Sequence, residues 1–141
     1  MHYITLKDKG GEAVILDTDG MKPIYVQIAE WLETEILSGN IGSDEKIYSQ
    51  YQLADMFNIN PATAAKGLNI LADENIVYKK RGLGMFVSPN GKAMILKKRK
   101  NQTLKKMIFE LVREGKRLGV SRDELIDMIE TAPNQWEEEG S

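Results

Sequence analysis

The feature that most constrains this fold is a short break, Asn58-Ile59-Asn60-Pro61, between two stretches with helical patterns. Asn60 is a favourable N-cap residue, and a proline directly after a cap is well suited to the first position of a helix. The break therefore ends one helix and starts the next within a few residues. Two short helices joined by so tight a turn are typical of a helix-turn-helix.

Both flanking segments carry apolar residues at helical spacing. Before the break, Ser49 is the predicted N-cap of a short helix that ends at Phe57. After it, a third helix is predicted from Pro61 to about Glu74, and an earlier helix from Pro23 to about Ser38, where Gly39 supplies a C-terminal cap. The predicted buried faces are Ile24, Ile28, Trp31, Leu32 and Ile36 in the first helix, Leu53, Ala54, Met56 and Phe57 in the second, and Ala64, Leu68 and Leu71 in the third.

Two β-prone triplets, residues 76–78 and 85–87, follow the third predicted helix. The six residues between them include three cations and two glycines, which suits a tight, basic hairpin tip. A basic hairpin directly after a helix-turn-helix indicates a wing. The tip is formed by Lys79, Lys80, Arg81, Gly82, Leu83 and Gly84.

The C-terminal part predicts two more helices. Residues 93–118 form a long helix that Gly119 ends, and Ser121 to Glu124 form a capping-box pattern that opens a last helix. Their apolar residues are more than two helices can bury by themselves, so they pack either on the first domain or on a second copy of the chain. The two-fold symmetry of dimeric DNA sites favours the copy. The predicted dimer interface consists of Leu104, Met107, Ile108, Leu111, Val112, Leu118, Leu125, Ile126, Met128 and Ile129.

The 141 residues divide into four predicted parts. Residues 1–20, which contain two short apolar runs, form either a small strand pair or a flexible arm, with an unknown role. Residues 21–90 form a winged helix-turn-helix domain, residues 91–132 a small all-α dimerisation region, and residues 133–141 an acidic flexible tail. The predicted fold class is α+β, mainly α.

Composition excludes several classes of function. The chain has no cysteine, so disulfides and thiolate metal sites are ruled out and a reducing cytoplasm is the expected location. The one histidine is His2, and no HExxH, phosphate-loop or dinucleotide pattern occurs. No apolar run reaches the roughly 18–20 residues that cross a bilayer. We therefore expect no cofactor, no metal, no membrane partner and no enzymatic activity.

Net charge argues against a nucleic-acid partner at first sight. The whole chain carries a formal charge of −2, and residues 1–90 hold eight Lys and Arg against twelve Asp and Glu. A DNA-binding surface must therefore arise from local placement of cations. The negative charge of the first domain also keeps open the alternative of a winged-helix module that binds protein.

The sequence resembles the GntR family of bacterial regulators over roughly residues 21–88. Asn60-Pro61-Ala62-Thr63 and a C-terminal part of about fifty residues are similar to the YtrA subfamily, as is the tract from Leu118 to Leu125. The sequence departs from the family at Tyr48-Ser49-Gln50, where Pro-Ser-Glu is usual, and at Ala64 and Ala65. The family resemblance rests on Pro23-Ile24-Tyr25-Val26-Gln27-Ile28-Ala29-Glu30, Ile36-Leu37-Ser38-Gly39, Ser49-Gln50-Tyr51-Gln52-Leu53-Ala54 and Gly82-Leu83-Gly84-Met85-Phe86-Val87.

The resemblance implies a homodimeric repressor of an operon that includes its own gene, often one encoding an ABC transporter. In such a motif the third helix enters the major groove, the start of the second helix meets a phosphate, and the wing neutralises the backbone. A small-molecule effector is possible, and the sequence does not identify it. The predicted contacts with double-stranded operator DNA are Ser49, Gln50, Tyr51, Asn60, Ala62, Thr63, Lys66, Lys79, Lys80, Arg81, Gly82 and Gly84.

Overall fold

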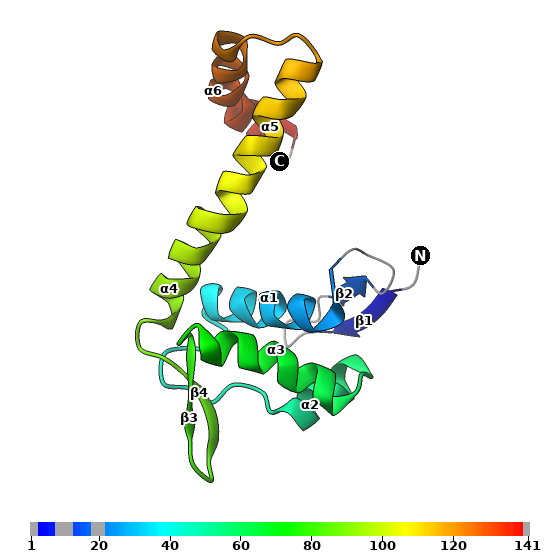
Figure 1. Cartoon of the computed structure of the whole chain (residues 1–141), viewed down its shortest axis with the longest axis vertical. Coiled ribbons are helices and arrows are strands. Elements are labelled where there is room, and N and C mark those ends of the chain that lie inside the picture. The colour runs from blue at the N-terminus through cyan, green and yellow to red at the C-terminus, as the bar shows by residue number, and fades with distance from the viewer. Residues whose placement is uncertain (1–2, 8–12, 18–21, 140–141) are drawn as a thin grey trace. The chain divides into compact units, whose positions relative to one another are not determined.

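The computed structural model describes residues 3–7, 13–17 and 22–139, with side chains for Leu16 and residues 22–133. The chain divides into two compact units, residues 1–96 and 97–141. The first unit contains β1 (Tyr3–Lys7), β2 (Ala13–Asp17), α1 (Ile24–Leu37), α2 (Gln50–Phe57), α3 (Pro61–Asp73), β3 (Val77–Lys80), β4 (Gly84–Val87) and the start of α4 (Gly91–Lys98) (Figure 1). The second contains the end of α4, the π-helical segment η1 (Arg99–Leu104), α5 (Lys105–Arg117) and α6 (Arg122–Glu139).

The core of the first unit lies between α1, α2 and α3. The predicted buried faces meet there, and the side chains of Leu32, Leu53 and Phe57 are completely enclosed. α1 and α3 approach closely because α3 carries Gly67 at the crossing. A Cβ built on Gly67 would lie 2.9 Å from the carbonyl oxygen of Tyr25 in α1. The two helices therefore touch backbone to backbone at this point.

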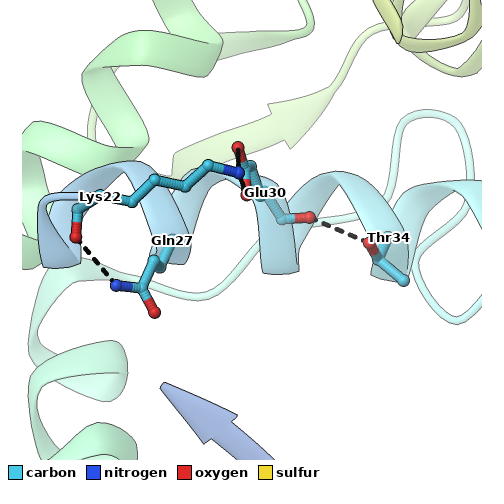
Figure 2. Close-up of polar contacts among 4 residues, drawn as sticks. All are labelled: Lys22, Gln27, Glu30 and Thr34. Carbon is cyan, nitrogen blue, oxygen red and sulfur yellow. Dashed lines mark hydrogen bonds and ion pairs between the residues drawn. The ribbon is translucent and has the colours of Figure 1, made fainter. Parts of the chain in front are cut away.

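A polar network surrounds the first turns of α1 (Figure 2). Lys22 Nζ lies 2.9 and 3.0 Å from the two carboxylate oxygens of Glu30, and the Gln27 amide donates to the Lys22 carbonyl at 3.0 Å. The Thr34 hydroxyl donates to the Glu30 carbonyl one turn later at 3.0 Å. Because the ion pair is exposed, it adds little stability, but it neutralises one of the acids of this unit.

The wing is a two-stranded sheet, as the sequence predicted, and an isolated β-bridge joins a third segment to it. β3 and β4 pair antiparallel with Tyr78 opposite Phe86 and Lys80 opposite Gly84, so the strands extend towards the tip and leave residues 81–83 as the turn. The segment 44–47 then pairs with the other edge of β4, with Lys46 opposite Phe86. The Ile47 amide donates to the Met85 carbonyl at 2.9 Å, and the Val87 amide donates to the Glu45 carbonyl at 2.9 Å.

The N-terminal extension forms a strand pair, one of the two alternatives for residues 1–20. β1 and β2 are antiparallel, with Tyr3 opposite Asp17 and Lys7 opposite Ala13. Leu16 is 3% exposed and belongs to the same apolar core as α1, α2 and α3. Residues 1–2, 8–12 and 18–21 lie outside the described part of the chain.

The first unit ends at Leu96, six residues beyond the predicted boundary at residue 90. The physical reason is Ile95, which is 0% exposed and part of the core, with Met94 packed beside it. The long helix also begins at Gly91, two residues earlier than predicted. A Cβ on Gly91 would lie 2.9 Å from the Ile76 carbonyl oxygen, so only glycine fits this close approach.

The C-terminal helices differ from the prediction in two further respects. The long helix is interrupted by η1, whose residues are polar except for Leu104 at its end. α6 continues through Pro133 to Glu139, where the sequence predicted a flexible tail from residue 133. Proline removes a single N–H donor, and its backbone stays helical here. Gly119 has a φ of +72° and ends α5, as predicted.

α5 and α6 meet at a small contact and leave most of their apolar side chains in solvent. Gly115 in α5 is buried against the side chain of Leu125 in α6, which is itself half-buried. The remaining apolar residues of the predicted interface are between 42% and 66% exposed, as is Phe109, which the sequence analysis did not include. Among the described residues, no helix is both long and apolar enough to cross a bilayer.

Candidate nucleic-acid interface

The turn of the helix-turn-helix is formed by one residue with a left-handed backbone conformation, which lies between two capped helices. α2 ends at Asn58, whose φ of 53° and ψ of 52° turn the chain, and the Ile59 amide donates back to the Ala54 carbonyl at 2.9 Å. Asparagine is one of the few side chains that adopt this conformation at low cost. Asn60 then caps α3, because its Oδ1 accepts from the Ala62 amide at 2.7 Å.

The N-terminal half of α3 presents a small polar surface. Asn60, Ala62 and Lys66 are exposed and Thr63 is half-buried, while Ala64 and Leu68 face the core. The Lys66 ammonium lies 5.8 Å from the centre of the Tyr25 ring, which α1 supplies. A cation over an aromatic face is held by the ring's electrostatic field. α3 therefore offers short side chains and one cation at the end that a helix-turn-helix inserts into the major groove.

The start of α2 is capped in both directions. The Ser49 hydroxyl accepts from the Gln52 amide at 3.1 Å, and Gln52 Oε1 accepts from the Ser49 amide at 2.8 Å. The Ser49 backbone N–H is therefore already donated to Gln52, and the contact of Ser49 with DNA stays a prediction. The amides of Gln50 and Tyr51 make no hydrogen bond to any residue that the structure describes, and the Tyr51 side chain is 70% exposed. The backbone donors open to a phosphate at this helix start are therefore those of Gln50 and Tyr51, and the Ser49 hydroxyl can still donate its own proton.

The wing tip gathers the predicted cations. Lys79, Lys80 and Arg81 are exposed, and Gly82 and Gly84 have φ of +79° and +113°, values that favour glycine. The Lys80 ammonium lies 4.5 Å from the centre of the Phe86 ring. Within the described residues, none of these three cations forms an ion pair, so their charge is available to a ligand.

Sequence reasoning missed Lys46, Tyr78 and Phe86, which lie side by side across segment 44–47 and the two wing strands. The Tyr78 hydroxyl donates to Asp44 Oδ1 at 2.7 Å, and this hydrogen bond raises the pKa of Tyr78 above its ordinary value. From the sequence alone, residues 40–46 are interpreted as a turn. Ile47 is the only residue nearby that favours a strand. The alternation of exposed Lys46 with buried Ile47 was the available signal.

The placement of charge accounts for the negative balance of the first domain. Glu33 and Glu35 are buried in α1, Glu30 is paired with Lys22, and Asp44 accepts from Tyr78. Glu33, Glu35 and Glu30 are consequently buried or ion-paired, whereas Asp44 keeps an exposed, hydrogen-bonded carboxylate. The wing sheet instead exposes four cations, Lys46, Lys79, Lys80 and Arg81. Among the described residues, no group of three or more His, Asp and Glu side chains is placed to hold a metal ion.

The fold and its surface define a winged helix-turn-helix protein. The sequence pattern of the bacterial regulatory proteins of the gntR family matches residues 24–87. The structure superposes on a GntR-family protein of Bacteroides thetaiotaomicron with a TM-score of 0.69 and 30% identity, covering 80% of this chain and 98% of that one. A GntR-family transcriptional regulator of Listeria monocytogenes gives a TM-score of 0.65 and 28% identity, with coverage of 80% and 97%.

Two relatives from Bacillus subtilis (strain 168) bear on the subfamily. The transcriptional repressor YtrA is 28% identical over 114 residues, which cover 81% of this chain and 87% of YtrA. The transcriptional repressor NagR is 38% identical over 66 residues, which cover 47% of this chain and only 27% of NagR. The chain belongs to the GntR family and is a DNA-binding transcriptional regulator, not an enzyme. The near full-length match is consistent with the YtrA-like subfamily.

Proposed function

We propose that this regulator is a repressor that binds an inverted-repeat operator as a homodimer, with one winged helix-turn-helix on each half-site. The observation that carries the proposal is the set of unpaired cations on the wing beside the capped, cation-bearing start of α3. Wing and helix are the parts that touch DNA in proteins of this architecture. YtrA and NagR are both repressors, which favours repression here as well.

Dimerisation is supported by the apolar face of α5. Leu104, Met107, Ile108 and Leu111 follow helical spacing on one side, and each is at least 42% exposed in the single chain. A contiguous exposed apolar surface of this kind marks an interface in soluble proteins. A second copy is the natural partner because a palindromic operator requires two recognition units. α6 adds Ile126, Met128 and Ile129.

The proposal extends to the gene context that the YtrA-like resemblance implies. We infer that the regulated operon includes the regulator's own gene and that an ABC-transporter operon is the first candidate. Such a regulator acts on DNA in the cytoplasm. A small-molecule effector would act at or near the dimer interface, since the two helices of the second unit leave little volume for an internal pocket.

The test is a fluorescence-anisotropy titration of the protein against labelled DNA from upstream of its own gene, with a scrambled duplex as control. We expect tight, salt-sensitive binding of one dimer, with clear preference for the upstream DNA. Replacing Lys79, Lys80 and Arg81 with glutamine should abolish this binding. The matched control replaces Lys116, Arg117 and Arg122, which removes the same charge from the second unit. Equal loss from both triple variants would show that net charge, not the wing, governs binding.

A further inference from the structure

The wing sheet has an outer face whose residues come from β3, β4 and the bridged segment 44–47. Lys46, Phe86 and Tyr78 lie directly opposite one another across segment 44–47, β4 and β3. Directly opposed residues of antiparallel strands project to the same face of a sheet. Lys80 and Gly84 form the next pair towards the tip, on that same face. We call these five residues the outer wing face.

Two aromatic rings form the floor of the outer wing face. The Tyr78 and Phe86 rings stack with their centres 6.0 Å apart, and the Lys80 ammonium lies 4.5 Å from the centre of Phe86 and 5.8 Å from that of Tyr78. The rings hold the lysine in place without neutralising it. The charge of Lys80 therefore stays directed at solvent.

Lys46 is held in a comparable way by Gly84. A Cβ built on Gly84 would lie 2.8 Å from Lys46 Cε and 3.6 Å from its Nζ, so the lysine stem crosses the glycine towards the wing tip. Any side chain at position 84 would displace it. Lys46 is exposed and makes no ion pair with any residue that the structure describes.

One acid, Asp44, lies at the edge of the outer wing face and is hydrogen-bonded to one of its residues. Asp44 Oδ1 accepts the Tyr78 hydroxyl at 2.7 Å. Glu45 is adjacent in sequence and alternates to the opposite side of the strand, where its carboxylate would lie 2.8 Å from a Cβ on Gly42. The outer wing face thus combines two ammonium groups with one carboxylate, that of Asp44, which is hydrogen-bonded to Tyr78 and forms no ion pair with Lys46 or Lys80.

We propose that the outer wing face binds the phosphate backbone of double-stranded DNA beside the groove that the tip enters, with Lys46 as a phosphate contact positioned by Gly84. This inference rests on the proposed function. Duplex DNA is the occupant that the charge favours, because it carries a negative charge about every 1.7 Å along its axis. Lysine provides a point charge suited to phosphate rather than to base recognition.

The experiment compares Lys46→Gln, Lys46→Arg and Lys92→Gln in the full-length protein. Lys92 is an exposed lysine of α4 outside the sheet, so its variant removes the same charge elsewhere in the first unit. Affinity is measured over a series of salt concentrations on two probes: a duplex selected by the wild-type protein from a random pool, and a scrambled duplex. Thermal unfolding of each variant shows whether it is folded.

We expect Lys46→Gln to reduce the slope of log affinity against log salt by about 0.9 per protomer, or about 1.8 for a dimer. This corresponds to roughly 60-fold weaker binding at 0.1 M salt and about 3- to 4-fold at 0.5 M. The loss should be similar on both probes because the contact is to backbone. Lys46→Arg should retain the slope, and Lys92→Gln should match the wild type.

The outcomes separate this inference from the proposed function. Equal slopes for Lys46→Gln and Lys92→Gln would overturn the inference and leave the proposed function intact. A loss confined to the selected duplex would also overturn it, since that result would indicate a base contact. A wild-type protein that binds both probes equally would contradict the operator proposal, whereas the Lys46 comparison would still decide the backbone contact. No binding to either probe would overturn both.

Discussion

Replacing Gly67 with alanine tests whether the approach of α1 and α3 is as close as the structure has it. Alanine is favoured over glycine inside a helix by about 1 kcal/mol, so local propensity alone predicts a more stable protein. The new Cβ would lie 2.9 Å from the Tyr25 carbonyl oxygen and 3.0 Å from Ile28 Cγ2. The carbonyl oxygen cannot move without shifting α1 itself. Such overpacking costs about 1–3 kcal/mol.

We expect the clash to win, with Gly67→Ala less stable by up to about 2 kcal/mol. The assay is urea unfolding followed by the fluorescence of Trp31, whose ring packs edge-on against Phe57 at 5.1 Å in the core. A Trp136→Phe background removes the only other tryptophan signal. All variants are compared at one protein concentration, because association shifts apparent stability.

Asn69→Ala provides the matched control for Gly67→Ala. Asn69 is exposed on the same helix, so its replacement gains propensity with no clash and should stabilise by a few tenths of a kcal/mol. If Gly67→Ala stabilised the protein as much as Asn69→Ala, the backbone contact between α1 and α3 would be refuted. Gly67→Ala should also weaken DNA binding, because it displaces the helix that carries Lys66.

Three further predictions follow from individual contacts. Ile95→Ala should destabilise the first unit by about 2–5 kcal/mol in the same Trp31 assay. Leu96→Ala, which replaces the exposed neighbour, should change the stability little. Equal effects would contradict a core that extends into α4. Gly115→Ala should weaken the α5–α6 contact, because the new Cβ clashes with the Leu125 side chain. In a double-mutant cycle, adding Leu125→Ala should restore part of this loss. In a tyrosinate absorbance titration, the component that titrates at the highest pH should vanish in Tyr78→Phe and move to lower pH in Asp44→Asn. Because the pKa of Tyr78 is raised, the Tyr78–Asp44 hydrogen bond stabilises the fold fully below the ordinary tyrosine pKa of about 10 and loses this effect at higher pH. An unchanged titration curve in the two variants would refute the assignment.

Elements with strong local signals were predicted from the sequence and are confirmed. Ser49, Asn60 and Gly119 each carry a capping preference that needs no distant partner, and each lies at the helix end expected for it. The turn at Asn58 follows from the same local chemistry. Fold class and family rest on this kind of information.

Features that depend on distant partners were not predicted. Lys46 forms its β-bridge only because β4 offers an edge forty residues later in the chain. The inclusion of Ile95 depends on the shape of a core assembled elsewhere. In each case a tertiary contact outweighs the local pattern.

The contribution of β2 to the core matters for how this protein is divided for study and for how such regulators diverge. The shared family pattern begins at residue 24, yet Leu16 closes the same apolar core from eight residues before it. A fragment cut at the family boundary would expose the space that Leu16 fills. Sequence outside the shared pattern can therefore drift only together with the positions that it covers. Grafting this winged helix onto another protein would require the strand pair to be transferred with it.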